Sequence, residues 1–542
     1  MLRKSLYFVA LVAIFVIGIF AGRLIEEKQF ISSNRLGHVL HLIERQYVDP
    51  VDMDSIQEQA IPLILGELDP HSTYLSAEMS RRENEGLNGS FEGIGVLFYR
   101  NADTIVVTRV IDGGASKRAG LLAGDRILKA DTTSLIGADL SDEDIMGNLK
   151  GPANSVVKLL ICRDGQNKTI SVVRGPVPVS TLDAAYMVRP GILYIRINKW
   201  GIRTHQEVLT AYARHLKEGI EGLIIDLRDN SGGYLEASLS LAGEFLNKGQ
   251  LILYAEGRAF PRENYVNPKP GLLVDMPLVV LVNEFSASAS EIFAGVMQDY
   301  DRATIIGRRT FGKGLVQQPF MLSDSSVVRL TVARYYTPSG RSVQKSYADG
   351  NLDYAKDLLR RFEHGELHNA DSISEADSAR YYTSGGRVVH AAGGITPDIF
   401  VPRDTAGINP YYTRLLDHGM LARFSFDYAD KNRKQLSSFQ TTEALNDYLK
   451  SLGKGFLFEF AYYAQARGVA IRTTYLHQSA ELILTRLRAN IADQVSLDTN
   501  ALYKIAMEHS PELLEGINLI EDGGWNPIRT KQNDQAGLSA DL

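Results

Sequence analysis

The sequence predicts a chain of several domains. These are an α/β core on a mixed sheet, an inserted β-rich module, a helical N-terminal region and a mostly helical C-terminal region. Apolar strand-like runs alternate with amphipathic helices in residues 177–402, which is typical of crossover units and an at least partly parallel sheet. Short β-branched runs and glycine turns dominate residues 86–176. Helical spacing of apolar residues dominates both flanks, residues 31–85 and 403–542.

Length and composition set the broad class. The chain has 542 residues, 44% hydrophobic and 23% charged, which is ordinary globular composition with length for about two to four domains. The net charge of −6 does not point to nucleic acid as a partner. The single cysteine, Cys162, excludes an intrachain disulfide and a cysteine-based metal site. We expect neither a metal nor a cofactor.

The N-terminus, residues 1–30, carries a targeting signal. Arg3 and Lys4 precede the uncharged run LYFVALVAIFVIGIFAG, residues 6–22, and Arg23 follows it directly. The length of the run is close to the minimum that spans a membrane, and no convincing small-x-small cleavage site follows it. We expect an uncleaved signal anchor, with a cleaved signal as the alternative. The basic residues then stay in the cytoplasm, and the remaining chain faces the periplasm of a bacterial cell.

Residues 31–85 carry a helical pattern, as in LGHVLHLIERQYV, and end in DPHSTYL, residues 69–75. The proline and the short polar residues predict a turn into another element. His71 lies in this turn. It is either a hydrogen-bonded packing residue, which we favour, or a catalytic base.

Residues 86–176 form the β-rich module. TIVVTRVI, VVKLLICR and KTISVVRG predict strands, and SKRAGLLAGDRILKAD predicts a helix, a turn and a strand. The last segment, residues 116–131, resembles the signature of PDZ domains. FEGIGV, residues 91–96, then resembles the carboxylate-binding loop of these domains. The alternative for GIG is a strand with a bulge, and Pro152 to Ser155 depart from the usual PDZ pattern.

The resemblance implies that this loop binds the C-terminal tail of a protein or peptide. Such a tail adds as a strand to a sheet edge, while backbone N–H groups of the loop hold its carboxylate. Glycine permits the close backbone approach. The expected loop residues are Phe91, Gly93, Ile94, Gly95 and Val96.

The α/β core places polar residues at the ends of two buried strands. GLIIDLRDN and LVVLVNEF are apolar runs that end in polar residues, and SGG and SASASE follow them. Functional sites in such sheets gather at the carboxyl ends of the strands. We therefore expect DLRDNSGG and NEFSASAS to meet at one edge of the sheet. Residues 346–390 are charged and predict a partly helical insertion in this core.

The stretch SASASE, residues 286–291, permits two interpretations. Ser288 and Glu291 form the S-x-x-E capping-box pattern before the apolar run IFAGVM, so Ser288 caps a predicted helix. A helix start is also a place for a nucleophile, because its N–H groups and dipole favour an oxyanion. The N–H of Ala289 and that of Gly232 or Gly233 are the candidate donors.

A lysine is the candidate base. The sequence holds eleven histidines, none of them in a recognisable triad motif, and no G-x-S-x-G surrounds Ser288. Lys313 lies in TFGKGLVQQ between two strand-like runs. Burial there would lower its pKa from about 10.4 and permit a Ser-Lys pair. Gln317, four residues on, lies on the same side of an extended strand and could orient the amine.

The same segment holds GRRTFGK, residues 307–313, which fits the G-x-x-x-x-G-K spacing of a phosphate-binding loop. Such a loop needs Ser or Thr next and then a helix. Here Gly314 follows, and LVQQPF predicts a strand. We therefore reject nucleotide binding.

The order of these segments resembles the carboxyl-terminal processing, or tail-specific, proteases. NEFSASASEI and TFGKGLVQ are similar to their two catalytic blocks, and DPHSTYL, DLRDNSGG, YTPSGRSVQ and GGITPD also match. The resemblance implies a serine endopeptidase of the envelope that binds protein tails. It implies Ser288 as nucleophile, Lys313 as base and Gln317 as its partner, with Ala289 and one glycine of the 232–233 pair at the oxyanion.

The resemblance covers residues 35–402. The insertion and residues 403–542 depart from the minimal pattern, and the latter could support a homo-oligomer or an adaptor. Two rival functions remain open from the residues alone. One is a PDZ scaffold whose protease core is inactive, and the other is a hydrolase with a histidine base such as His71.

Overall fold

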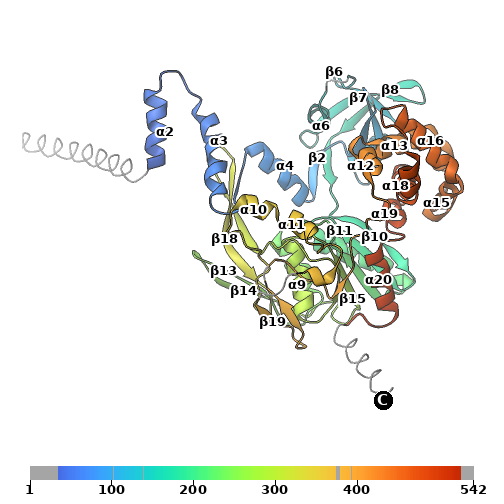
Figure 1. Cartoon of the computed structure of the whole chain (residues 1–542). Coiled ribbons are helices and arrows are strands. Elements are labelled where there is room, and N and C mark those ends of the chain that lie inside the picture. Colours follow the sequence, from blue (N-terminus) through green and yellow to red (C-terminus); the bar gives the residue numbers. More distant parts are fainter. Residues whose placement is uncertain (1–34, 102, 138–139, 374–378, 392, 527–542) are drawn as a thin grey trace, which may run out of the picture. The chain divides into compact units, whose positions relative to one another are not determined.

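A computed structural model describes residues 35–526 except 102, 138–139, 374–378 and 392 (Figure 1). The predicted anchor, residues 6–22, and the polar end of the chain lie outside the described residues. Within those ranges, no helix combines the length and the apolar character needed to cross a bilayer. The chain forms two units, residues 1–74 and residues 75–542.

The described part of the first unit, residues 35–74, contains two helices and a turn. The helices are α2 (Arg35–Gln46) and α3 (Met53–Gly66). Asp52 caps α3 by accepting the N–H groups of Asp54 and Ser55 at 3.1 and 3.2 Å. In the predicted turn, Asp69 Oδ1 accepts the N–H groups of His71 and Ser72, each at 2.8 Å. β1 (Thr73–Leu75) follows.

In the second unit, α4 (Ala77–Leu87) leads into the β-rich module. The strands of its main sheet lie in the order β3-β4-β5-β7-β8, with antiparallel neighbours, so β3 is an edge strand. β2 (Ser90–Gly93) and β9 (Gly175–Pro178) pair and close the module where the chain enters and leaves it. The other elements are β3 (Val96–Asn101), β4 (Thr104–Val110), α5 (Ala115–Ala119), β5 (Arg126–Ala130), β6 (Thr133–Ser134), α6 (Asp142–Leu149), β7 (Val156–Arg163) and β8 (Gln166–Val173).

The α/β core is built on a six-stranded sheet in the order β10-β11-β12-β15-β16-β21. All neighbours are parallel except β10 and β11, so the predicted mixed sheet is confirmed. The strands are β10 (Leu182–Arg189), β11 (Ile192–Ile197), β12 (Gly222–Asp226), β15 (Leu278–Val282), β16 (Thr304–Gly307) and β21 (Ile399–Phe400). The helices between them are α7 (Thr204–His215), α8 (Leu235–Gly243) and α9 (Ala289–Asp299), with η1 (Leu216–Glu218) after α7. Every residue of α9 is buried.

A second, antiparallel sheet was not expected from the sequence. It contains two hairpins, in which β13 (Leu251–Gly257) pairs with β14 (Phe260–Val266) and β17 (Leu315–Met321) pairs with β18 (Val327–Tyr336). β13 also pairs with β18, which joins the hairpins. This sheet matters for function because β17 carries Gln317 and β18 carries Tyr335.

The predicted insertion, residues 346–390, is partly helical. It contains α10 (Asn351–Ala355), α11 (Asp357–Glu363), η2 (Ala370–Ser372) and a hairpin of β19 (Arg380–Tyr382) and β20 (Val388–His390). After the hairpin turn, Arg387 pairs with Asp301 and Asp398, each at 2.5 Å. These ion pairs tie the insertion to the core.

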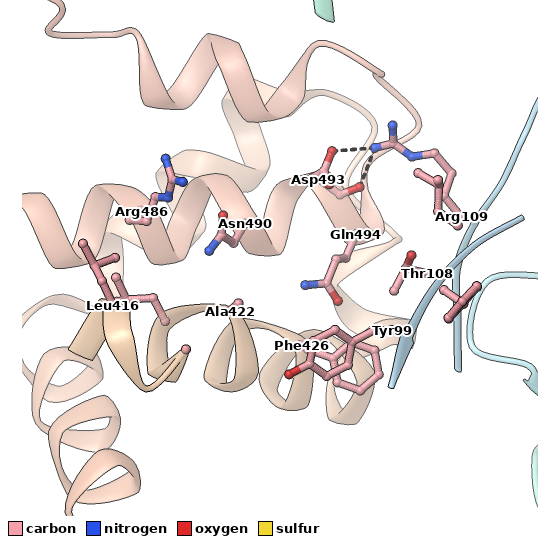
Figure 2. A pocket seen from close by; sticks show the side chains of 14 residues that line it. Tyr99, Thr108, Arg109, Leu416, Ala422, Phe426, Arg486, Asn490, Asp493 and Gln494 are labelled. Atoms are coloured by element: carbon pink, nitrogen blue, oxygen red, sulfur yellow. Dashed lines mark hydrogen bonds and ion pairs between the residues drawn. The ribbon is translucent and has the colours of Figure 1, made fainter. Parts of the chain in front are cut away.

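The C-terminal region is helical, as predicted, with a core of its own. Its helices are α12 (Pro410–Asp417), α13 (Met420–Lys431), α14 (Arg433–Leu436), α15 (Thr442–Ser451), α16 (Gly453–Gln465), α17 (Thr473–Gln478), α18 (Ala480–Val495), α19 (Ala501–Ala506) and α20 (Pro511–Glu521). Figure 2 shows how α13 and α18 meet the outer face of β3 and β4. Phe426 stacks on Tyr99 with ring centroids 4.5 Å apart, and Asp493 pairs with Arg109 at 2.8 Å. A cavity of about 340 Å³ lies between these elements.

The last helix of the described residues, α20, returns to the α/β core. Figure 1 shows α20, in red, beside β15, and its residues Leu513 and Ile517 pack on the sheet face opposite α9. Gly516 permits this close approach, because a Cβ there would lie 3.2 Å from Val279 Cγ1. Residues 511–521 thereby become part of the core, which the helical pattern alone did not reveal.

Candidate active site

Three loops follow the carboxyl ends of three neighbouring parallel strands. We name them the β12 loop (residues 227–233), the β15 loop (residues 283–288) and the β16 loop (residues 308–314). Backbone hydrogen bonds of 3.0 Å join them, from Ala287 to Asn230 and from Phe311 to Ser286. The predicted meeting of DLRDNSGG and NEFSASAS therefore occurs, and the segment with Lys313 lies beside them.

The three serines of SASASE differ in what their hydroxyl groups contact. Ser286 is fully buried, and its hydroxyl accepts the Asn283 N–H at 2.9 Å and donates to Leu227 O at 2.8 Å. Ser290 is also fully buried, and its hydroxyl accepts from Trp200 Nε1 and donates to Asn230 O. Ser288 is only half-buried. The hydroxyl groups of Ser286 and Ser290 thus hold the loops together, whereas Ser288 is accessible.

The backbone at Ser288 is unusual. Its φ of 57° and ψ of −115° lie in a region that L-residues rarely adopt. Ser288 is the N-cap of α9, and its N–H donates to Glu291 Oε2 at 2.8 Å, as the S-x-x-E pattern predicts. Ala289 is the first residue of the helix. This sharp strand-to-helix turn presents the serine at the positive end of a buried helix.

Lys313 and Gln317 contact each other. Lys313 Nζ donates to Gln317 Oε1 at 2.9 Å, and both side chains are half-buried. Lys313 lies in the β16 loop, two residues before β17 begins, and not inside a strand as the apolar pattern suggested. The loop position leaves its backbone N–H available to Glu291, which a paired strand residue would not.

A buried carboxylate holds the backbone of Ser288 beside that of Lys313. Glu291 Oε2 accepts the N–H groups of both residues at 2.8 Å. Its Oε1 accepts the Gly312 N–H at 2.7 Å and the Thr310 hydroxyl at 2.6 Å. From the second sheet, the Tyr335 hydroxyl lies 3.1 Å from Ser288 O and 2.6 Å from Lys313 O. Two side chains therefore bridge the same two residues.

Burial dominates the electrostatics of this bridge. It raises the pKa of Glu291 to about 7, although the hydrogen bonds from Thr310, Lys313, Gly312 and Ser288 act in the opposite direction. Burial also raises the pKa of Tyr335 well above its usual value, so this phenol stays protonated and can donate.

The two predicted glycines lie beside Ser288 in different ways. A Cβ on Gly232 would lie 2.8 Å from Ser288 Cβ and 3.3 Å from Ala289 N, so only glycine fits here. The Gly232 N–H donates to Asn230 Oδ1 at 2.9 Å. Gly233 lies against Trp200, where a Cβ would be 2.2 Å from the carbonyl oxygen. An oxyanion that bound to Gly232 would compete with Asn230 for its N–H.

The predicted carboxylate loop lies between β2 and β3. Phe91 and Gly93 belong to β2, whereas Val96 begins the edge strand β3. Ile94 is buried in the core of the module, and its carbonyl accepts the Ser116 N–H at 2.7 Å. Gly95 has a φ of 78°, and a Cβ there would lie 3.3 Å from Gly114 Cα. The loop thus turns sharply at Gly95 and leads into an open sheet edge.

Three further features concern metal binding, nucleotide binding and His71. In the described part of the chain, no group of three or more His, Cys, Asp or Glu could hold a metal ion. Lys313 is followed by β17 and not by a helix, so the G-x-x-x-x-G-K match lacks the context of a phosphate-binding loop. His71 lies in the Asp69 turn of the first unit.

Comparison with known proteins decides the family. The Peptidase family S41 model matches residues 191–352, a PDZ domain model matches residues 93–173, and a family of unknown function matches residues 411–496. A carboxy-terminal-processing protease of Bartonella bacilliformis is 36% identical over 362 residues, which cover 64% of this chain and 81% of the relative. The chain belongs to the carboxy-terminal-processing protease family.

The chain is also similar to a second curated relative and to a solved structure. A probable CtpA-like serine protease of Staphylococcus aureus is 32% identical over 312 residues, which cover 57% of this chain and 62% of the relative. A solved photosystem II D1 C-terminal processing protease is 27% identical, with a TM-score of 0.33, over 67% of this chain and 86% of that one. This protein is a serine-type peptidase with a PDZ domain.

Two contributors to the protease site were missed in the sequence. Glu291 was interpreted only as a helix cap, although its position three residues after Ser288 was the signal. Tyr335 lies next to YTPSGRSVQ, a motif that was noted without a role. Neither residue's contact with Lys313 could be read from spacing, because these contacts join separate elements.

We expect Glu291→Gln to lose most activity. The amide replaces an acceptor oxygen with a donor that faces N–H groups, which separates the backbone of Ser288 from that of Lys313. The kcat should fall by about 100-fold, and the variant should lose about 2 to 3 kcal/mol of stability. Peptidase assays and thermal unfolding measure both, with the exposed Glu221→Gln as control. Wild-type kcat in a folded Glu291→Gln protein would contradict this.

Glu291 also predicts a pH dependence of stability. Its folded pKa of about 7 lies above the ordinary value of 4.5, so proton uptake favours the folded state. This contribution is complete below pH 4.5 and is lost as the pH rises through about 7. The melting temperature of the wild type should therefore fall, relative to that of Glu291→Gln, between about pH 5 and pH 8. Parallel pH profiles for the two proteins would rule out this titration.

Proposed function

We propose that this protease cleaves polypeptides with Ser288 as nucleophile, Lys313 as general base and Gln317 as the residue that orients the amine. The observation that carries the proposal is the arrangement at the three loops. Ser288 is the accessible serine, and its backbone shares Glu291 and Tyr335 with that of Lys313. Lys313 in turn directs its amine to Gln317.

The reaction would proceed through an acyl-enzyme. Neutral Lys313 takes the proton of the Ser288 hydroxyl as the oxygen attacks the scissile carbonyl carbon. The ammonium then gives this proton to the leaving amine, and the peptide C–N bond breaks. A water molecule, deprotonated by the same lysine, then attacks the ester carbon. The lysine ammonium returns this proton to Ser288 Oγ as the ester C–O bond breaks, which releases the second product and restores the free serine. Ala289 N–H and a glycine N–H of the β12 loop would stabilise the oxyanion of each tetrahedral intermediate.

We further propose that the PDZ domain binds C-terminal tails. β3 is an edge strand, so a tail could pair with it, and the turn at Gly95 precedes it directly. This geometry suits strand addition with the tail carboxylate held by the N–H groups of the loop. The PDZ model match over residues 93–173 supports the proposal.

We also propose that the protease acts in the cell envelope. The support is the sequence alone: Arg3 and Lys4 before the uncharged run of residues 6–22. An anchored enzyme should stay with the membrane fraction after a carbonate wash, and protease added to spheroplasts should digest it. A soluble periplasmic form without the run would indicate cleavage. Recovery in the cytoplasm would refute the location.

The base is tested by Lys313→Met, which removes the amine and keeps the length of the side chain. We expect kcat/KM on an unfolded protein to fall by about 1,000-fold, and Ser288→Ala to be at least as inactive. His71→Ala should cleave at nearly the wild-type rate and is the comparison for a histidine base. Near-normal turnover by Lys313→Met would defeat the Ser-Lys assignment. So would a larger loss of activity in His71→Ala than in Lys313→Met.

The tail site is tested by Gly95→Ala. The new Cβ strains a φ of 78° and presses on Gly114, so affinity for a C-terminal peptide should fall by about 10-fold. Gly165→Ala is the matched control, because Gly165 has the same φ of 78° and open space around it at the β7–β8 turn. Calorimetry with a free-acid peptide and its amide measures binding. Equal affinities of Gly95→Ala and Gly165→Ala would refute the loop assignment.

A further inference from the structure

Two buried arginines stand at the start of two active-site loops. Arg228 lies in the β12 loop, which ends in the oxyanion glycines, and Arg308 lies in the β16 loop, which ends in Lys313. Both side chains are buried, with 7% and 6% of their surface exposed. A buried guanidinium cannot lose its proton, so each needs a carboxylate partner.

One carboxylate serves both arginines, and it comes from the other end of the sequence. Glu512 Oε2 accepts from Arg228 Nη1, and Glu512 Oε1 accepts from Arg308 Nη1, each at 2.8 Å. Burial raises the pKa of Glu512, but the combined effect of Arg228 and Arg308 in lowering it is larger. The pKa of Glu512 therefore lies below the usual range. Glu512 stays ionised and lies in the first turn of α20, where a helix favours negative charge.

These pairs form a chain of alternating charge across the strand ends. Arg228 also binds Asp226 at the end of β12, and Arg308 also binds Glu284 of the β15 loop at 2.8 Å. Glu512 is the member that joins the β12 loop to the β16 loop. Without its charge, Arg228 would keep Asp226 and Arg308 would keep Glu284, but the carboxylate between the two guanidinium groups would be lost and these two cations would repel each other in a low-dielectric site.

We propose that Glu512 is a positioning residue for catalysis, which holds the oxyanion glycines of the β12 loop at a fixed distance from Lys313. The proposal rests on the Ser288–Lys313 assignment above. It makes the C-terminal segment a working part of the active site, because α20 packs on the core sheet and supplies the one charge that both loops share.

The test compares Glu512→Gln with Glu515→Gln in the full-length protein. Glu515 is on the same helix, and in the described ranges it has no ion pair. For Glu512→Gln we expect kcat to fall by about 10- to 100-fold with KM within about 2-fold, because loops that shift by a fraction of an ångström lose alignment. Glu515→Gln should match the wild type in both constants.

A second measurement separates positioning from folding. A serine-directed phosphonate labels the nucleophile, and we follow both the fraction of molecules labelled and the rate constant. Positioning predicts complete but slowed labelling of Glu512→Gln. A reduced fraction with a normal rate constant would mean that Glu512 acts only in folding, and this would overturn the proposal. Mapping the wild-type adduct tests Ser288 separately, because the ratio of rate constants does not depend on which serine reacts.

Chemical rescue gives a third readout. Glu512→Ala leaves a space between two guanidinium groups that formate can fill, whereas neutral formamide has the size but not the charge. We expect formate to raise the kcat of Glu512→Ala by about 10-fold. Formamide should leave the kcat of this variant unchanged, and formate should leave that of Glu515→Ala unchanged. Equal responses to formate and formamide, or wild-type kcat in Glu512→Gln, would overturn the proposal.

Discussion

The proposed active site depends on one buried carboxylate. Glu291 is fully buried and accepts four hydrogen bonds, three from backbone N–H groups and one from Thr310. These donors come from the helix start that carries Ser288 and from the loop that carries Lys313. A carboxylate in this place is costly unless every acceptor is used, so the loops can close around it in only one way.

Charge extends this arrangement outward along the sheet edge. Loops at the ends of parallel strands lack the regular backbone hydrogen bonds that join the strands themselves, so side chains must fix the spacing of these loops. Here the spacing is set by hydrogen bonds from Ser286 and Ser290 inside the site and by Arg228, Glu512 and Arg308 beside it. The same buried ion pairs stabilise the fold little, because desolvation offsets their attraction. We infer that they serve geometry more than stability.

The helical C-terminal region contacts both the PDZ domain and the protease sheet of the second unit. Its α13 and α18 meet the PDZ domain through Phe426 and Asp493, and its α20 lies on the protease sheet. A tail bound at β3 would therefore lie on a domain that is already braced by helices, as Figure 2 illustrates for Tyr99 and Arg109. The helical region matches a family of unknown function over residues 411–496, and its helices pack on both the PDZ domain and the protease sheet.

Much of this protein followed from local patterns in the sequence. Strand and helix periodicity, the glycines of GIG and the S-x-x-E cap each act over a few residues, so the sequence by itself determined the mixed sheet, the PDZ module and the candidates Ser288, Lys313 and Gln317. Only the tertiary structure decided which side chains meet. Lys313 lies in a loop, Glu291 bridges two elements, and Glu512 reaches loops more than two hundred residues upstream. The packing of helices and strands determines which buried charges pair with each other, and short-range sequence patterns do not contain that information.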